Sequence, residues 1–225
     1  MKDSDYFKFD IVTVVPALLF VLIMWGVYWL EVRFHLRFNR HGILPQKISG
    51  LQGVVFGPFI HSGLKHLWSN SLPSLILLTA LSFFYRRISL FVLITGLLLT
   101  GGLTWLIGRP SYHIGASGVV YMLTAFLFFK GLFTGHYKLL SLSFLVAFFY
   151  GSMVWYVFPI EEGISWEGHL SGAISGIVLA IFTKNKLPQK KKYLWELEHY
   201  NEDEDLFMRH FDENGNFIEF SDEEE

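Results

Sequence analysis

Residues 115–134 read GASGVVYMLTAFLFFKGLFT, and this stretch decides the fold class of the chain. From Ser117 onward nearly all of its side chains are apolar, and as a helix it is long enough to cross a bilayer core of about 30 Å. The apolar segment nevertheless opens on a serine, which lies between Gly115 and Gly118. A polar group at the mouth of a membrane span is a candidate for function.

Similar apolar stretches lie on both sides of this one. Because backbone groups in lipid must be satisfied within a helix, we expect six membrane helices, over residues 11–31, 65–85, 89–108, 117–134, 139–159 and 168–184. The composition agrees, with 52% hydrophobic residues and a mean hydropathy of +0.39. The sequence thus predicts an all-α polytopic membrane protein, a bundle of six transmembrane helices.

Some classes of protein are excluded at this point. The chain contains no cysteine, so it has no disulfide framework, no thiolate zinc site and no cysteine nucleophile. No internal repeat or inverted pair stands out among the six segments, which argues against a transporter built from repeats.

Both ends of the chain differ from its apolar centre. Residues 1–10 are polar and precede the first span without a small-residue cleavage site, so we expect a short cytoplasmic segment and a retained first span. The membrane domain then covers residues 11–185. Thirteen of the 20 acidic residues follow Trp195, which predicts a solvated acidic tail over residues 186–225. Within it, Asn214-Gly215 would suit a tight turn.

The connections between spans carry the charges that predict orientation. Basic residues gather after the second span, around the turn between the fourth and fifth spans, and after the last span: Arg86, Arg87, Lys130, Lys138 and lysines 184, 186, 190, 191 and 192. By the positive-inside rule these positions and both termini are cytoplasmic. The long first connection, residues 32–64, is also basic and opposes the rule. Its arginines and aromatics over residues 32–40 are spaced for an amphipathic helix in the membrane interface.

Ser117 belongs to the first of three polar clusters at the ends of the predicted spans. It could simply cap its helix. The amides and the positive dipole end at a helix start also favour the oxyanion that a serine nucleophile creates. Gly118 leaves room beside the hydroxyl, and Tyr121 lies one turn further on the same helical face. The position therefore suits either a cap or a nucleophile.

His169 opens the sixth span, where Gly168, Gly172 and Gly176 recur every four residues. Small residues at this spacing let two membrane helices pack closely, and close packing is all that the pattern requires. Close packing would also allow a histidine to reach the serine of another span. Histidine is well suited to take a serine proton near neutral pH. Because no carboxylate inside a span is placed to orient it, a Ser–His dyad is favoured over a triad.

The third cluster comprises His66 and Asn70, four residues apart on the second span, with His61 just before it. Polar residues of this kind often only join membrane helices by hydrogen bonds. An imidazole and an amide aimed at one point would also form an oxyanion hole. In the predicted topology spans two, four and six begin on the same side, so the three clusters share one membrane depth.

With these residues the chain resembles the rhomboid intramembrane serine proteases. The likeness covers residues 50–184 and rests on Gly115-Ala116-Ser117-Gly118, Tyr121, Gly168-His169-Leu170, Gly172, Gly176, His61, His66 and Asn70. It implies that Ser117 is the nucleophile and His169 the general base. It further implies that His66 and Asn70 are oxyanion donors. Tyr121 would pack against the histidine, and His61 would brace the first loop.

The resemblance also implies a substrate class and a location. Transmembrane proteins would be cleaved in or near their membrane segments, within the lipid bilayer, without metal, cofactor or nucleic acid. We expect a multi-pass protein of a bacterial inner (plasma) membrane with both termini cytoplasmic; the oligomeric state is not set by the sequence. One departure is visible in the first loop, which reads Phe56-Gly57-Pro58-Phe59-Ile60 where many members carry a Trp-Arg pair.

Two other functions fit parts of the pattern. A catalytically silent relative would bind membrane clients without cutting them, but such relatives usually lack the serine or the histidine, and both are present here. A metal or haem protein ligated by His61, His66 and His169 would need converging ligands supported by further hydrogen bonds. The sequence has no His-Glu-x-x-His pattern and no carboxylate within a span other than Glu31 at the end of the first, so proteolysis is the favoured function.

Overall fold

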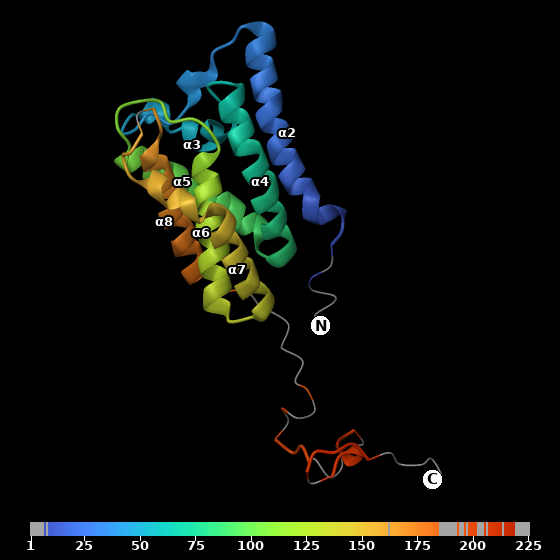
Figure 1. The fold of residues 1–225 in the computed structure, drawn as a ribbon. Coiled ribbons are helices and arrows are strands. Elements are labelled where there is room, and N and C mark those ends of the chain that lie inside the picture. The colour runs from blue at the N-terminus through green and yellow to red at the C-terminus, as the bar shows by residue number, and fades with distance from the viewer. Residues whose placement is uncertain are drawn as a thin grey trace. The chain divides into compact units, whose positions relative to one another are not determined.

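The computed structural model describes residues 7, 9–161, 163–184, 193, 196, 198–201, 205, 207–212 and 214–218. The chain forms two compact units, Met1–Leu187 and Pro188–Glu225. The described part of the first unit is helical and contains no β-strand (Figure 1). Its α-helices are α2 (Ile11–Phe34), α3 (Gly53–Phe56), α4 (Leu64–Phe84), α5 (Ser89–Ile107), α6 (Ser117–Thr134), α7 (Tyr137–Tyr150) and α8 (Trp166–Phe182).

Five segments of the described chain are long and apolar enough to cross a membrane: α2, α4, α5, α6 and Tyr137–Val157. The last of these joins α7 to the 3₁₀ helix η4 (Gly151–Val157). Helix α8 is apolar but has only 17 residues. The predicted all-α polytopic fold is confirmed, and the count of six spans holds approximately. The span predicted over 139–159 corresponds to Tyr137–Val157, but its α-helix stops at Tyr150 and a tighter 3₁₀ turn follows from Gly151.

The first span begins at a capped end. Asp10 accepts a hydrogen bond from the Thr13 amide while the Thr13 side chain accepts one from the Asp10 amide, so two backbone donors are satisfied reciprocally. Arg86, just beyond α4, donates to the same carboxylate at 2.8 Å. This hydrogen bond is the main reason why the pKa of Asp10 lies below its usual value. The pair links the start of α2 to the end of α4.

The first connection differs from its prediction. Residues 32–40 do not form a separate amphipathic helix, because α2 continues to Phe34 and ends at His35, whose φ of 54° closes the helix in the left-handed region. Three 3₁₀ turns and α3 follow: η1 (Phe38–His41), η2 (Ile48–Gly50) and η3 (Gly57–Phe59). Within this connection Ile43 exchanges two backbone hydrogen bonds with His113. The first connection is thereby fastened to the loop between α5 and α6.

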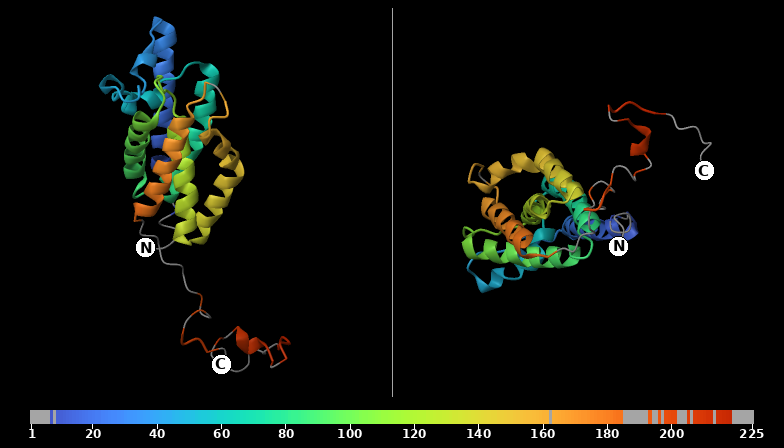
Figure 2. Two further views of the ribbon diagram at one scale, coloured as in Figure 1. Left: turned by 90° about the vertical axis from the view of Figure 1, so that its left-hand side faces the viewer. Right: turned by 90° about the horizontal axis from the view of Figure 1, so that it is seen from below.

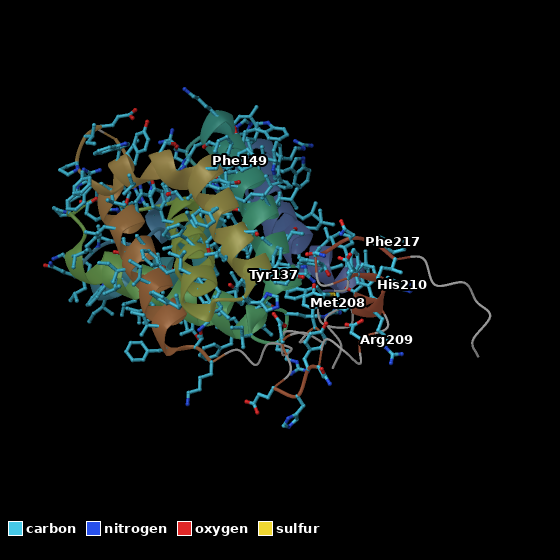
Figure 3. The ribbon with its side chains drawn as sticks, turned by 60° about the horizontal axis from the view of Figure 1, so that its bottom comes forward. Tyr137, Phe149, Met208, Arg209, His210 and Phe217 are labelled. Atoms are coloured by element: carbon cyan, nitrogen blue, oxygen red, sulfur yellow. The ribbon has the colours of Figure 1, made fainter. Side chains whose placement is uncertain are left out.

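Helix α6 is the centre of the bundle. Seen from below, α4, α5, α7 and α8 surround it, and α2 packs against α4 outside this ring (Figure 2). Its buried side chains come from all around the helix: Val119, Val120, Tyr121, Met122, Leu123, Phe126, Leu127 and Lys130. Outer helices instead expose large apolar side chains; Phe148 and Phe149 of α7 are 83% and 64% exposed (Figure 3). Apolar side chains exposed on this scale suit a protein surrounded by lipid.

The positive-inside prediction counted Lys130 among the charges of the loops, but Lys130 is not in a loop. It lies within α6, is buried, and donates its ammonium to the carbonyls of Ala180 and Thr183 at the end of α8. A cation here satisfies carbonyls that lack partners in the helix and complements the negative end of its dipole. Lys130 therefore stabilises the packing of α6 on α8 and does not bear on orientation.

The second unit includes a short hairpin-like turn. Phe211 and Phe217 form an antiparallel bridge around Asn214-Gly215, and Gly215 has a φ of +78° that favours glycine. His210 stacks on Phe217 with ring centroids 5.6 Å apart (Figure 3). The turn that Asn214-Gly215 would suit is thus present, within a segment for which a solvated tail was predicted. Lysines 186 and 190–192 lie outside the described residues.

Candidate active site

Ser117 is the first residue of α6 and not its N-cap. Ala116 occupies the cap position, and no side chain caps the helix there. The hydroxyl of Ser117 is therefore not used as a cap, while the amides of the first helical turn lie beside it. Gly115, two residues earlier, has a φ of +101°, a conformation that side chains rarely adopt. The turn into α6 thus needs a glycine at this position.

His169 reaches Ser117 from α8. Its Nε2 lies 2.9 Å from Ser117 Oγ, and its Nδ1 lies 2.9 Å from the carbonyl oxygen of Tyr156 in η4. A carbonyl can only accept, so Nδ1 carries the proton and Nε2 accepts the hydroxyl of Ser117. The Tyr121 ring stacks on the imidazole, with centroids 4.2 Å apart and an angle of 9°, and donates its hydroxyl to Met153. The Tyr156 carbonyl therefore holds one edge of the His169 imidazole, and the Tyr121 ring covers one of its faces.

The short distance between α6 and α8 depends on glycines. A Cβ added to Gly172 would lie 2.2 Å from the Gly118 carbonyl oxygen, and one added to Gly176 would lie 2.3 Å from that of Met122. A Cβ on Gly118 would meet the Gly168 carbonyl oxygen at 3.2 Å. The helices touch through their backbones here, and this contact brings His169 to Ser117.

His66 and Asn70 of α4 face the same turn. A Cβ on Gly115 would lie 2.6 Å from His66 Nε2 and 3.7 Å from Asn70 Nδ2. One Asn70 amide proton goes to the His66 carbonyl at 3.0 Å, and His66 Nδ1 lies 3.2 Å from Ser62 Oγ. If Nδ1 accepts the Ser62 hydroxyl proton, Nε2 is left as a donor toward Gly115. Each side chain can then offer one N–H close to Ser117.

His61 lies behind this pair. Its ring meets the His66 ring edge on, with centroids 5.0 Å apart, and its Nδ1 donates to the Phe59 carbonyl at 3.3 Å. Only 2% of the residue is exposed. Burial, and to a smaller extent the charge of His66, lowers the pKa of His61 to about 4. A neutral His61 therefore joins the first connection to the start of α4.

Ser117, His169 and the His66–Asn70 pair border one cavity. It has a volume of about 920 Å³ and is lined by Ser117, His169, Tyr121, His66, Asn70 and Tyr156, among others. This volume is large enough for a peptide segment, since small-molecule sites occupy roughly 300–1,000 Å³. Among the described residues, no group of three or more His, Asp or Glu side chains is placed to hold a metal ion.

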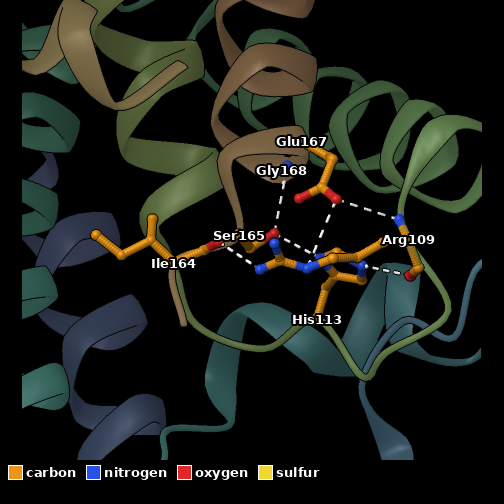
Figure 4. A network of polar contacts seen from close by, with 6 residues as sticks. All are labelled: Arg109, His113, Ile164, Ser165, Glu167 and Gly168. Atoms are coloured by element: carbon orange, nitrogen blue, oxygen red, sulfur yellow. Dashed lines mark hydrogen bonds and ion pairs between the residues drawn. The ribbon is translucent and has the colours of Figure 1, made fainter. Parts of the chain in front are cut away.

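Several residues of the site were missed from the sequence. Tyr156 contributes only its carbonyl, which any residue could supply, so no signal identified it. Arg109, His113, Ser165 and Glu167 form a polar network between the loop before α6 and the start of α8 (Figure 4). The position of Ser165, directly before an apolar helix, is a capping signal that could have been recognised.

Comparisons with known proteins show the family of the chain. A model of the family described as Rhomboid domain matches residues 49–186. The "Uncharacterized protein Rv1337" of Mycobacterium tuberculosis is 37% identical over 174 residues, which cover 72% of this chain and 72% of the relative. The "Uncharacterized protein ML1171" of Mycobacterium leprae is 34% identical over 180 residues, which cover 74% of this chain and 69% of the relative. The chain is therefore an integral multi-pass membrane protein that belongs to the rhomboid family.

Proposed function

We propose that this protein is an intramembrane serine endopeptidase that hydrolyses peptide bonds in or near the transmembrane segments of membrane-anchored substrates. The observation that carries the proposal is the 2.9 Å hydrogen bond from Ser117 Oγ to His169 Nε2, with His169 Nδ1 held by the Tyr156 carbonyl. A serine becomes an effective nucleophile when a base lies within hydrogen-bond reach of its proton.

The chemistry follows from this arrangement. His169 takes the hydroxyl proton as Ser117 Oγ attacks the scissile carbonyl, and the same imidazole then protonates the leaving amine. A water molecule activated by His169 hydrolyses the acyl-enzyme and regenerates Ser117. The reaction needs no metal, because proton transfer and charge stabilisation are both supplied by side chains and backbone.

The negative charge that develops on the substrate oxygen needs donors. The Ser117 amide, an N–H of Asn70 and Nε2 of His66 are the donors in this proposal. Their proximity to Gly115 supports it, because a substrate carbonyl attacked by Ser117 would lie over that turn. The apolar exterior and the bacterial relatives support a bacterial inner membrane as the location. The basic residues in the short connections are the reason to propose that both termini are cytoplasmic.

A cleavage assay tests the proposal. The full chain, in vesicles together with a membrane-anchored reporter, should release the soluble part of the reporter. Ser117→Ala and His169→Ala should each abolish this release while remaining inserted and folded. A protein in which both variants cut as fast as the wild type does not use this dyad. A wild-type protein that binds the reporter without cutting it is a catalytically silent member of the family.

A further inference from the structure

A second serine–histidine pair lies beside the first. His113 belongs to the loop that joins α5 to α6, and Ser165 directly precedes α8. His113 Nδ1 lies 2.5 Å from Ser165 Oγ, and the histidine is 5% exposed (Figure 4). The pair therefore connects the segment that leads to Ser117 with the segment that leads to His169.

The donor and the acceptor can be assigned for each hydrogen bond around His113 and Ser165. The Gly168 amide donates to Ser165 Oγ at 3.3 Å, which makes Ser165 the N-cap of α8. His113 Nε2 lies 3.1 Å from the Arg109 carbonyl and so carries the ring proton, while Nδ1 accepts the Ser165 hydroxyl. A neutral His113 thus satisfies both of its nitrogens, and Ser165 both accepts and donates.

Arg109 and Glu167 make a second connection between the same two segments. The Arg109 amide donates to Glu167 Oε1 at 3.2 Å, its Nε lies 3.7 Å from that oxygen, and its Nη2 donates to the Ile164 carbonyl at 2.6 Å. The Glu167 side chain is 2% exposed. A buried carboxylate is costly unless it is paired, so its position is fixed by Arg109.

We propose that Arg109, His113, Ser165 and Glu167 are positioning residues that set the distance between Ser117 and His169. Ser117 is four residues from His113, and His169 is four residues from Ser165, so movement at one connection displaces a reacting group directly. The inference rests on the proposed proteolytic function. A displacement of about 1 Å at reacting atoms can lower a rate by roughly 100-fold.

Other contacts of the loop do not perform this task. Backbone hydrogen bonds from His113 to Ile43 and from Gly115 to Gly57 tie the loop to the first connection. The glycine contacts, which begin at Gly118 and Gly168, hold α6 itself against α8 and do not involve the loop before α6. Neither these backbone hydrogen bonds nor the glycine contacts join the loop to the first turn of α8. The side chains of Arg109, His113, Ser165 and Glu167 make that connection.

The test uses the full chain with two disrupting variants, Ser165→Ala and Glu167→Ala. Both kcat for reporter cleavage and the rate of labelling by a small fluorophosphonate should fall by roughly 10-fold to 100-fold per folded molecule. The small probe makes few contacts in the cavity, so a matching loss in both assays reports on the dyad and not on substrate binding. Ser165→Thr keeps the hydroxyl and should restore most of the rate.

Lys130→Met is the matched control. It removes hydrogen bonds at the other end of α8, so it should lower the melting temperature and leave both rates per folded molecule unchanged. The proposal is overturned if Ser165→Ala and Glu167→Ala retain wild-type rates, or if Lys130→Met loses as much activity as they do.

Hydrogen–deuterium exchange separates this inference from the proposed function. Exchange of the amides over residues 109–116 should rise in Ser165→Ala and stay unchanged in Lys130→Met, with no substrate present. Unchanged exchange in Ser165→Ala would overturn the positioning role. A wild-type chain that neither cuts the reporter nor reacts with the probe would overturn the proteolytic function instead.

Discussion

Two serine–histidine pairs, Ser117–His169 and Ser165–His113, lie at the start of α6 and α8, and the members of each pair are separated by 52 positions in the sequence. In both pairs the second histidine nitrogen faces a backbone carbonyl, Tyr156 in one and Arg109 in the other. The ring nitrogens are exchanged between the pairs, because His169 faces its serine with Nε2 and His113 faces its serine with Nδ1.

The difference lies on the serine side. Ser165 Oγ accepts the Gly168 amide and caps α8, whereas the hydroxyl of Ser117 has no capping role at the start of α6. Ser117 also has His66 and Asn70 across Gly115, the side chains that we propose as donors for a developing oxyanion. In the proposed function, a hydrogen-bonded serine and histidine act as a catalytic dyad only where charge can develop and be stabilised.

The largest expected effect separates the two serines directly. Ser117→Ala should lower kcat by at least about 10⁴-fold, because the nucleophile itself is removed. A fluorophosphonate should modify Ser117 and leave Ser165 unmodified, which peptide mass spectrometry of the labelled chain would show. The label should be absent from His169→Ala. An adduct on Ser165 would mean that the two pairs do not differ as described.

The oxyanion donors give the next effect. Asn70→Ala should lower kcat roughly 100-fold with little change in KM, because the amide is used mainly in the transition state. Steady-state kinetics on the reporter would measure this. Ser69→Ala, on the adjacent residue of α4, whose hydroxyl donates to the His66 carbonyl, serves as the control and should remain close to wild type. An equal effect of the two substitutions would remove Asn70 from the oxyanion site.

The third prediction tests whether the contact between Gly172 and Gly118 sets the distance from Ser117 to His169. Gly172→Ala places a Cβ against the Gly118 carbonyl, so α8 must shift and His169 must move from Ser117. We expect a loss of roughly 10-fold or more in kcat. Gly102→Ala on α5 is the matched control, since its new Cβ would meet no atom within 4 Å. Similar kinetics for both variants would show that the backbone contact does not govern the dyad.

The smallest effect concerns a histidine outside both pairs. The pKa of His61 is about 4 in the folded protein and about 6.5 when exposed, so the unfolded chain binds a proton that the folded chain excludes as pH falls below 6.5. The contribution of neutral His61 is complete above pH 6.5 and is lost progressively toward pH 4. At pH 5 this amounts to about 2 kcal/mol of unfolding free energy.

Melting temperatures at pH 7 and pH 5 measure this dependence. The wild type should lose more stability on acidification than His61→Gln, whose side chain does not titrate. Equal losses in the two proteins would show that His61 is not buried in its neutral form.

Much of this protein was predictable because its signals are local. Apolar length gave the spans, the glycine spacing indicated close packing of the fourth and sixth spans, and the motif around Ser117 indicated the candidate nucleophile. Errors arose where the outcome depended on a partner far away in sequence. Lys130 was counted as a loop charge because its partners, the last carbonyls of α8, lie 50 and 53 residues further on.

The sequence by itself determined the fold class, the family and the residue types of the candidate site. It could not decide which serine caps a helix and which keeps its hydroxyl uncapped beside an imidazole. Ser117 and Ser165 both stand where an apolar helix begins. Only the tertiary structure decided this. The backbone contact at Gly118 and Gly172 sets one histidine against an uncapped hydroxyl, while the loop before α6 sets the other against a helix cap. Hydrogen-bond roles depend on atoms brought within about 3 Å, and sequence spacing does not specify such distances between helices.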